Sequence, residues 1–567
     1  MNNESKRFKL SPLRKISGFT RPMSVTDAFI YNFLAMGVIF PWVYLWGPAS
    51  FPGGNVEIAI WLTLLAQIPI SLAYTFLSTA LPVTGGDYVF QSRAFGAFGF
   101  VAVMSGFVIW ILQWVALSGW LLCTLGLAPM FMSIGVRLNI PQWTVAAVWV
   151  ESPIGICVIS IALSLVTALF LNRGMRVYVK VQRLLFALTI VAIFAVIGIF
   201  AFESGSLGGR IDDFVGSVIG QLHLVTSPDL SSQFTSKLVA DVAGAGVDLH
   251  PAFSWLATLG IIPIAWTSLQ WATYSVEQST EIENADKIWA QLTMLLGSAV
   301  AVAVFLVLVA HAEHLATSKA FVASISHAYW AGKGSASSVA FVKTTLQPFP
   351  NVLAMAAAPN LLVSLLIGIG LIANSFQVTC NSFMGVTRII VQMATDNCLP
   401  EKWGVVDPIR HAPVRAMWLY FFASVPVIVG YNLIAAWSTY TLGVTFACGY
   451  VFMMSCVAAS RLTLPPLKEY WMSSESYRYP GWLVRGIGIL ASILAGAMVL
   501  AYLVLPQLGI TGNVPYLVVA AVIGASFVII VWARVRSPLL DKKLRSVPVD
   551  ESSFFEANAS HDEKSGD

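Results

Sequence analysis

Long stretches without a charged side chain divide the chain into apolar segments. A helix that crosses a bilayer needs about 20 apolar residues, and most of these stretches are long enough for one helix. The stretches between Arg415 and Arg461 and between Arg485 and Arg534 each have room for two. The pattern predicts twelve membrane-spanning helices, at residues 26–46, 56–80, 96–124, 153–172, 181–202, 253–276, 288–310, 354–382, 414–431, 436–460, 484–505 and 514–534.

The composition supports this interpretation. The 567 residues are 57% hydrophobic and 11% charged, whereas soluble globular domains have about 25% charged residues. We therefore predict an all-α polytopic membrane protein whose first apolar run stays in the membrane as a helix. The six cysteines lie in predicted spans or on the predicted inner face, which argues against a structural disulfide.

The basic residues indicate an orientation. If both termini face the cytoplasm, 26 of the 32 Lys and Arg residues lie on the inner side and six lie outside. This asymmetry follows the positive-inside rule and favours an even number of spans. The net charge of +4 then reflects topology, so we expect the lipid bilayer and a small solute as partners and no nucleic acid.

The spans group into two blocks of five. We divide the chain into a cytoplasmic tail at 1–25, a first repeat at 26–203, an external loop at 204–252, a second repeat at 253–460 with an external loop at 311–352, peripheral helices at 484–534 and a cytoplasmic tail at 535–567. Because each block holds an odd number of spans, the second is inverted relative to the first, as is typical of secondary transporters. His311 and His314 flank Glu313, but they lack the spacing of a helical zinc pair, so we expect no metal.

The first helix of each block carries the most informative polar residues. Inverted-repeat transporters bind solute where these helices break at mid-membrane. The first helix contains Asn32, Met36 and Gly37. The second helix contains the stretch PIAWTSLQWATYS (263–275), rich in side chains that form hydrogen bonds. Ser, Thr and Gln also bond within or between helices in ordinary packing, so a structural role remains open for each.

These residues and two opposing helices define a predicted solute site. Its candidate residues are Asn32, Met36, Gly37, Gln113, Trp266, Thr267, Ser268, Gln270, Trp271 and Asn374. No carboxylate, lysine or arginine lies near the centre of a predicted span, where a charge usually marks function. A neutral or zwitterionic solute fits best, and Glu277 is a candidate for an inner gate.

Four motifs on the predicted inner face resemble those of the amino acid–polyamine–organocation (APC) transporter superfamily. They read LPVTGGDYVFQSRAFG (81–96), NRGMRVYVKVQ (172–182), STEIENADK (279–287) and TRIIVQMATDNCLPEKW (387–403). The resemblance covers about residues 25–460 and implies a 5+5 inverted-repeat, leucine-transporter-like core with two peripheral helices. It also implies alternating-access transport of the amino acid permease type.

The chain departs from the family pattern at the site itself. The glycine-rich break of the first helix falls on residues 36–40 with one glycine, and Gln270 and Trp271 replace small residues. Some relatives carry a lysine where this chain has Thr189. A sodium site formed by Thr189 and Thr379 is therefore one hypothesis, and the coupling ion, Na⁺ or H⁺, stays open.

We expect a secondary active transporter of amino acids in the cell (plasma) membrane. The alternatives are the same fold with a nucleobase or another small organic solute, or a non-transporting sensor on a transporter scaffold. No nucleophile–base constellation, metal-ligand pair or phosphate loop is present, so we expect neither an enzyme nor a cofactor. The oligomeric state stays open.

Overall fold

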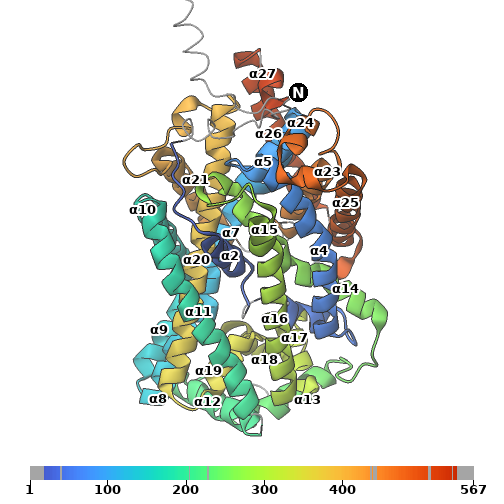
Figure 1. Cartoon of the computed structure of the whole chain (residues 1–567). Coiled ribbons are helices and arrows are strands. Elements are labelled where there is room, and N and C mark those ends of the chain that lie inside the picture. Colours follow the sequence, from blue (N-terminus) through green and yellow to red (C-terminus); the bar gives the residue numbers. More distant parts are fainter. Residues whose placement is uncertain are drawn as a thin grey trace, which may run out of the picture.

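The computed structural model describes residues 18–38, 41–203, 205–226, 229–434, 437, 444–508, 513–538 and 540–545. Within these ranges the fold is helical without any β-strand, apart from two isolated bridges, Met23–Ile282 and Thr84–Gln278. The helices form an elongated bundle (Figure 1). The two bridges join loops at one end of the bundle.

Nine helices in the described ranges are long and apolar enough to cross a membrane. They are α4 (Val56–Ala80), the continuous helix Ala97–Leu138, α10 (Pro153–Leu171), α11 (Met175–Phe202), the continuous helix Ile288–Ala316, α20 (Leu361–Thr395), α21 (Val414–Leu433), α25 (Gly481–Val504) and α26 (Val514–Arg536). Most agree with predicted spans within a few residues. The chain is therefore a multi-pass membrane protein.

Two of the long helices contain wider turns. The helix Ala97–Leu138 consists of α6 (Ala97–Val103), η1 (Met104–Ile109), α7 (Ile111–Trp120), η2 (Leu121–Leu127) and α8 (Ala128–Leu138). The helix Ile288–Ala316 consists of α15 (Ile288–Gln291), η5 (Leu292–Gly297) and α16 (Ser298–Ala316). The segments η1, η2 and η5 are π-helical. Such bulges occur frequently at functional sites.

Three predicted spans are shorter helices. The first consists of α2 (Val25–Met36) and α3 (Val43–Ser50), and α2 ends where Gly37 adopts a φ of 65° that side chains disfavour. The sixth changes without a gap from α14 (Trp255–Leu269) to the 3₁₀ helix η3 (Gln270–Glu277). The tenth is described from Val444 to Ser460 as α23.

Two predicted spans have wrong boundaries. The third, expected at 96–124, continues as a helix to Leu138. The expected span 354–382 starts inside α19 (Pro350–Ala357), and α20 begins only at Leu361, because the Asn360 side chain caps it by accepting a hydrogen bond from the Val363 N–H. The other end of α20 continues to Thr395, beyond the apolar stretch, and polar side chains such as Arg388 and Gln392 are buried there.

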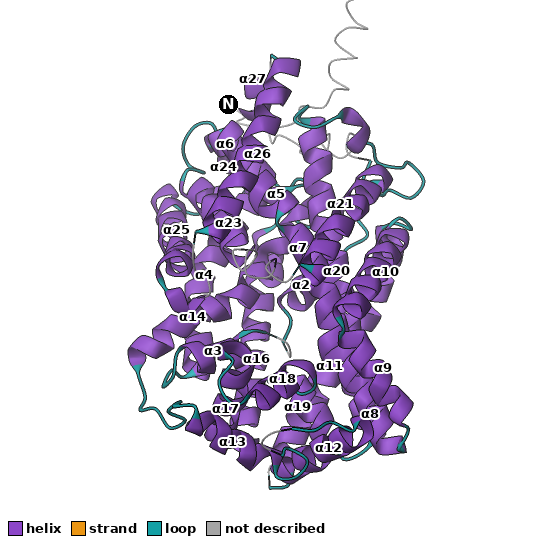
Figure 2. Ribbon diagram, turned by 180° about the vertical axis from the view of Figure 1, so that it is seen from behind, coloured by secondary structure: helices purple, strands orange, loops and turns teal. Residues whose placement is uncertain are grey.

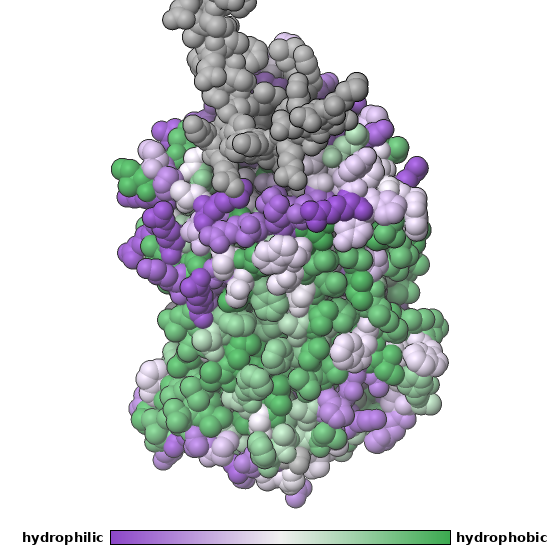
Figure 3. Space-filling model, in the orientation of Figure 1, coloured by the Kyte–Doolittle hydropathy of each residue, from purple (hydrophilic) through white to green (hydrophobic). Residues whose placement is uncertain are grey.

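Short helices cover the two ends of the bundle. The α13 end carries α9 (Pro141–Glu151), α12 (Leu207–Leu222), α13 (Phe234–Gly244), α17 (Lys319–Ala331), α18 (Ala336–Thr344) and α19 (Figures 1 and 2). The α5 end carries α5 (Gly86–Phe95), η4 (Ser279–Glu281), η6 (Glu401–Trp403), α24 (Lys468–Ser473), η7 (Glu475–Arg478) and α27 (Leu540–Arg545), while η8 (Pro506–Leu508) follows α25. A broad apolar belt lies between more polar ends (Figure 3), as a bilayer requires.

Close packing between α7 and α10 yields a first prediction. A Cβ atom on Gly119 would lie 2.8 Å from the Ser160 Cα, so Gly119→Ala must push the helices apart. Overpacking costs about 1–3 kcal/mol, and we expect a lower melting temperature in detergent. The control is Gly198→Ala in α11, where a Cβ would meet nothing within 4 Å. Equal melting temperatures of the two variants would contradict this packing.

Candidate functional site

The broken first helix is tied to η3 by one buried amide. Asn32 donates from Nδ2 to Ser275 Oγ and to the Met294 carbonyl, both at 2.9 Å, and its Oδ1 accepts the Ser275 N–H at 2.9 Å. Both the nitrogen and the oxygen of the Asn32 amide therefore have hydrogen-bond partners within the protein. Asn32, a predicted site residue, holds α2 against η3 and η5.

Asn374 bonds to the backbone of α2 close to the same break. It lies on α20 and donates to the Leu34 carbonyl at 3.0 Å. Its Oδ1 and the neighbouring Ser375 Oγ are buried and have no hydrogen-bond partner among the described residues. This side of α20 therefore offers one acceptor and one hydroxyl beside the end of α2.

The polar run of the sixth helix is partly self-satisfied. Thr267 donates to the Ile264 carbonyl at 2.7 Å and Thr273 to the Gln270 carbonyl at 3.4 Å, as hydroxyls in spans often do. The Gln270 amide donates to the Thr267 carbonyl at 3.3 Å, but its Oε1 has no partner among the described residues. Ser268 is buried beside them.

Trp271 occupies the middle of an aromatic cluster. We call Phe107, Trp114, Trp271, Tyr274 and Phe452 the central aromatic cluster. The Trp271 ring centroid lies 5.2 Å from that of Tyr274, 5.4 Å from Trp114 and 5.6 Å from Phe452, in edge-to-face geometry. The Phe107 ring lies nearly parallel to it at 6.3 Å. The buried Trp271 Nε1 has no hydrogen-bond acceptor among the described residues.

Two predicted site residues have structural partners. The Trp266 Nε1 donates to Gln67 Oε1 on α4 at 3.0 Å, which anchors the indole between helices. Gln113 Oε1 accepts the Trp437 Nε1 at 3.0 Å. Met36 is buried at the end of α2, next to Gly37. Residues 39 and 40 of the predicted break lie outside the described ranges.

A second group of rings closes the α13 end. We call Trp42, Trp46, Trp120, Trp330 and Phe349 the outer aromatic cluster. The Trp42 ring stacks on Trp120 with centroids 5.7 Å apart and lies 5.7 Å from Phe349, while Trp46 packs on Trp330 at 4.7 Å. Rings from the start of α3, from α7 and α17, and from the residue before α19 therefore pack together.

Buried ion pairs close the α5 end. The Arg93 guanidinium contacts Asp396 at 2.6 Å, and Arg388 contacts Glu281 at 2.8 Å. Both pairs are buried and join different segments. Burial raises the pKa of the Glu281 carboxyl, and the adjacent Arg388 guanidinium opposes that shift. The α5 end is therefore held by electrostatic contacts between distant segments.

The two hydroxyls of the hypothetical sodium site lie apart. Thr189 donates to the Leu185 carbonyl at 2.9 Å and faces the Gly370 carbonyl of α20 at 3.4 Å. Thr379 donates to the Ser375 carbonyl. Gly370 and Thr379 are separated by about 13 Å of helix at ~1.5 Å per residue. The structure therefore does not bring Thr189 and Thr379 together.

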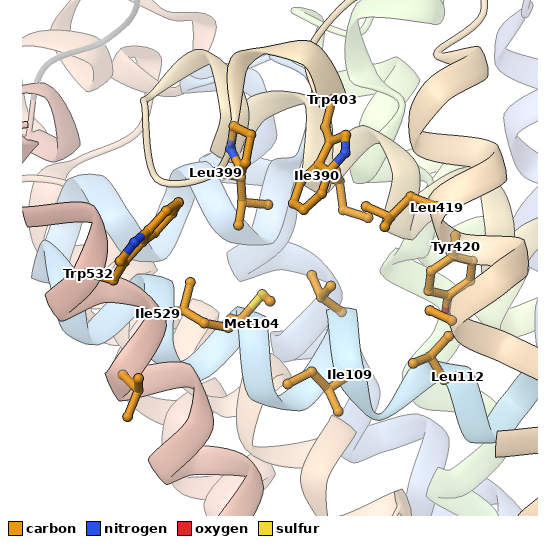
Figure 4. Close-up of a pocket in the computed structure, with 14 residues that line it drawn as sticks. Met104, Ile109, Leu112, Ile390, Leu399, Trp403, Leu419, Tyr420, Ile529 and Trp532 are labelled. Atoms are coloured by element: carbon orange, nitrogen blue, oxygen red, sulfur yellow. The ribbon is translucent and has the colours of Figure 1, made fainter. Parts of the chain in front are cut away.

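Two of the cavities have walls that contain no residue of the central aromatic cluster. One, of about 500 Å³, lies between η1, α7, α20, α21 and α26, and side chains such as Met104, Ile390, Tyr420 and Trp532 surround it (Figure 4). Its lining is almost wholly apolar, which suits neither end of a zwitterion. The other, of about 590 Å³, lies at the α13 end, where His314 Nδ1 contacts Glu57 Oε1 at 3.0 Å.

Comparison with known proteins assigns the family. The model of the amino acid permease family matches residues 29–528, nearly the whole predicted bundle. The chain belongs to this family and is an APC-superfamily transporter of the amino acid permease type. This agrees with the four inner-face motifs, and it indicates a transporter rather than an enzyme.

A short segment is also similar to a viral protein. The chain is 34% identical over 85 residues to uncharacterized protein 399 of Sulfolobus islandicus rod-shaped virus 1. The match covers 15% of this chain and 21% of the viral protein.

The sequence analysis missed most of the central aromatic cluster. Phe107, Trp114 and Phe452 come from η1, α7 and α23, and aromatic residues are too common in spans to stand out. Trp114 follows directly after Gln113, which was singled out. The π-helical turn at η1 carries Phe107, and no apolar pattern predicts such a turn.

The Asn32 contacts yield a second prediction. Asn32→Ala removes the partner of the buried Ser275 hydroxyl and N–H, at a cost of about 1–3 kcal/mol for each buried group left unsatisfied. The Met294 carbonyl keeps the Ser298 hydroxyl as a donor. We expect a markedly lower melting temperature in detergent. Asn432→Ala is the control, because among the residues that the structure describes Asn432 donates only to the Ile428 carbonyl of its own helix. Similar losses in both variants would show that Asn32 does not join the helices as described.

Proposed function

We propose that the chain is a secondary active transporter that moves neutral or zwitterionic amino acids by alternating access. The observation that carries the proposal is the set of unpartnered buried polar atoms around the first and sixth helices. They include Gln270 Oε1, Trp271 Nε1, Asn374 Oδ1 and Ser375 Oγ. A buried polar atom without a partner costs free energy, and the ammonium and carboxylate of an amino acid would supply partners.

The proposal includes a twelve-span, 5+5 topology. The nine long helices, with the three shorter helical segments at the first, sixth and tenth predicted spans, add up to the predicted number. The shortening of the first and sixth spans falls where inverted-repeat transporters interrupt their helices. The basic-residue count supports an orientation with the α5 end and both termini in the cytoplasm. The proposal also assigns the protein to the cell membrane.

In this mechanism the solute lies between two closures. The outer aromatic cluster would separate it from the outside, and the buried ion pairs would separate it from the cytoplasm. Trp271 fills the centre, so its indole would turn aside when solute binds between η3 and α20. Solute shifts the cycle only as far as it binds one state better than another.

A flat heteroaromatic ring is the second candidate solute. Phe107 and Trp271 lie nearly parallel, with an interplanar angle of 24° and centroids 6.3 Å apart. A modest opening of this pair would let a nucleobase stack between them. The same assay separates the two classes.

Solute counterflow provides the third prediction. The purified protein is reconstituted in liposomes, which are loaded with one unlabelled solute. Uptake of the same solute in labelled form is then measured, for a panel of amino acids, nucleobases and polyamines. We expect counterflow of neutral amino acids. Gln270→Ala and Trp271→Ala should reduce it at least about tenfold, equivalent to about 1.4 kcal/mol of lost interaction.

The control is Trp482→Ala, since Trp482 is 76% exposed on α25 and should not alter counterflow. Counterflow of nucleobases alone would show that the solute is a nucleobase and not an amino acid, and the proposed site would stand. If the folded protein gives no counterflow with any solute of the panel, transport of these solute classes is rejected.

A further inference from the structure

The start of α5 seals against the inner end of the sixth helix. The Gly85 N–H donates to the Glu277 carbonyl at 3.0 Å, and the Thr84 and Thr280 hydroxyls bond to each other. A Cβ atom on Gly86 would lie 2.7 Å from the Val276 carbonyl oxygen, so only glycine permits this approach. The segment 84–87 therefore closes directly over the last turn of η3.

Two carboxyl groups meet inside this contact. Asp87 and Glu277 are both fully buried. The Asp87 N–H donates to Glu277 Oε1 at 3.2 Å, and the two side chains lie within hydrogen-bonding reach of each other. Asp87 Oδ1 also accepts the Tyr74 hydroxyl at 2.5 Å and the Ser455 hydroxyl.

One oxygen of each carboxyl has no donor. Asp87 Oδ2 and Glu277 Oε2 are buried and have no hydrogen-bond partner among the described residues. Two carboxylate oxygens cannot bond to each other without a proton, because neither has a hydrogen to donate. One proton between the two groups would satisfy both free oxygens.

No positive charge compensates the pair within the described residues. The nearby guanidinium groups of Arg93 and Arg388 bind other carboxylates, Asp396 and Glu281. The titratable groups that face the pair are Tyr74 of α4, Cys456 of α23, Tyr31 of α2 and Tyr274 of η3. All four are neutral when protonated, so two ionised carboxylates would repel each other in a buried site.

We propose that Asp87 and Glu277 form a proton-binding site that holds one proton while the α5 end is closed and releases it when that end opens. Asp87 accepts two hydroxyl hydrogen bonds, which stabilise its charge, so Glu277 carries the proton and donates it to Asp87. When the segment 84–87 separates from η3, water reaches both groups. The O–H bond of Glu277 breaks, and the proton passes to water on the α5 side.

This inference deepens the proposed transport, because it names the proton as the ion that would link the inner gate to the cycle. A shared proton favours the closed state at low pH, and loss of the proton favours the open state. The solute site and the proton site are separate groups of atoms, so they can be tested separately.

Infrared spectroscopy tests the proton directly and needs no transport. We expect the carbonyl-stretch band of a protonated carboxylic acid in the purified wild-type protein, shifted in D₂O. Part of this band should disappear in Glu277→Gln and also in Asp87→Asn, because each change removes one member of the pair. Wild-type-like melting temperatures would confirm that the variants fold.

Glu313→Gln serves as the matched control. Glu313 is a buried carboxyl of α16 with no carboxyl neighbour in the described structure. Its own band should disappear without any effect on the Asp87–Glu277 band. Loss of intensity in Glu277→Gln but none in Asp87→Asn would show that Glu277 is protonated alone and would overturn a shared site. No loss in either variant would overturn the proton site altogether.

Counterflow at equal pH on both sides adds the fourth prediction. The wild-type rate should change at least about fivefold between about pH 5.5 and about pH 8.5, since each pH unit changes the protonation ratio tenfold. Glu277→Gln keeps a hydrogen-bond donor but cannot ionise, so its rate should change less than about twofold. The Glu313→Gln variant should retain the wild-type pH profile.

The two experiments separate the two proposals. A wild-type pH profile in Glu277→Gln would overturn the role of the pair in gating, whatever the infrared result. If no solute gives counterflow, the proposed function fails, while the infrared bands still decide whether the proton is there.

Discussion

A polar group inside a membrane-spanning bundle must find its partner within the protein, since lipid offers none. Asn32 meets this constraint where the first helix approaches its break. Its amide bonds at once to a side chain and a backbone N–H of η3 and to a carbonyl of η5. Because all three bonds leave α2, this helix and the 3₁₀ helix η3 are held together as one unit. Any movement at the α5 end must carry both or break buried hydrogen bonds.

The same constraint explains what the sequence could predict. Most span boundaries followed from charge-free stretches, because bilayer thickness sets a length that the chain must fill. The interruption of the sixth helix was foreseen from its polar run, but its form was not. Thr267 and Thr273 bond within their own helix, and the chain tightens to a 3₁₀ helix at Gln270 without opening a gap. Several polar side chains in one segment predict a functional region. They do not predict which of these side chains lack a hydrogen-bond partner in the folded protein.

Failures at single positions have equally physical causes. Thr189 and Thr379 were paired on family grounds, yet the register of α11 against α20 sets Thr189 beside Gly370. Trp266 was predicted at the solute site, and its indole donates to the Gln67 side chain of α4 while its ring packs on Phe452. Register and rotamer depend on contacts between distant segments, which one sequence does not reveal. Glu277 was recognised as a possible gate residue, whereas its partner Asp87 is visible only once α5 is placed.

The two ends of the bundle close by different physics. Ring contacts in the outer aromatic cluster contribute about 0.5–1.5 kcal/mol per pair beyond burial and are insensitive to pH. Ion pairs and a carboxyl pair at the α5 end respond to the protonation of the groups that form them. The unpartnered atoms at the centre belong to amides, a hydroxyl and an indole, none of which titrates near neutral pH. In the proposed cycle, the centre would select a solute by shape and hydrogen bonds while the α5 end would sense protons. The tie between α2 and η3 would connect the two mechanically, because η3 carries both Trp271 and, in its last turn, Glu277.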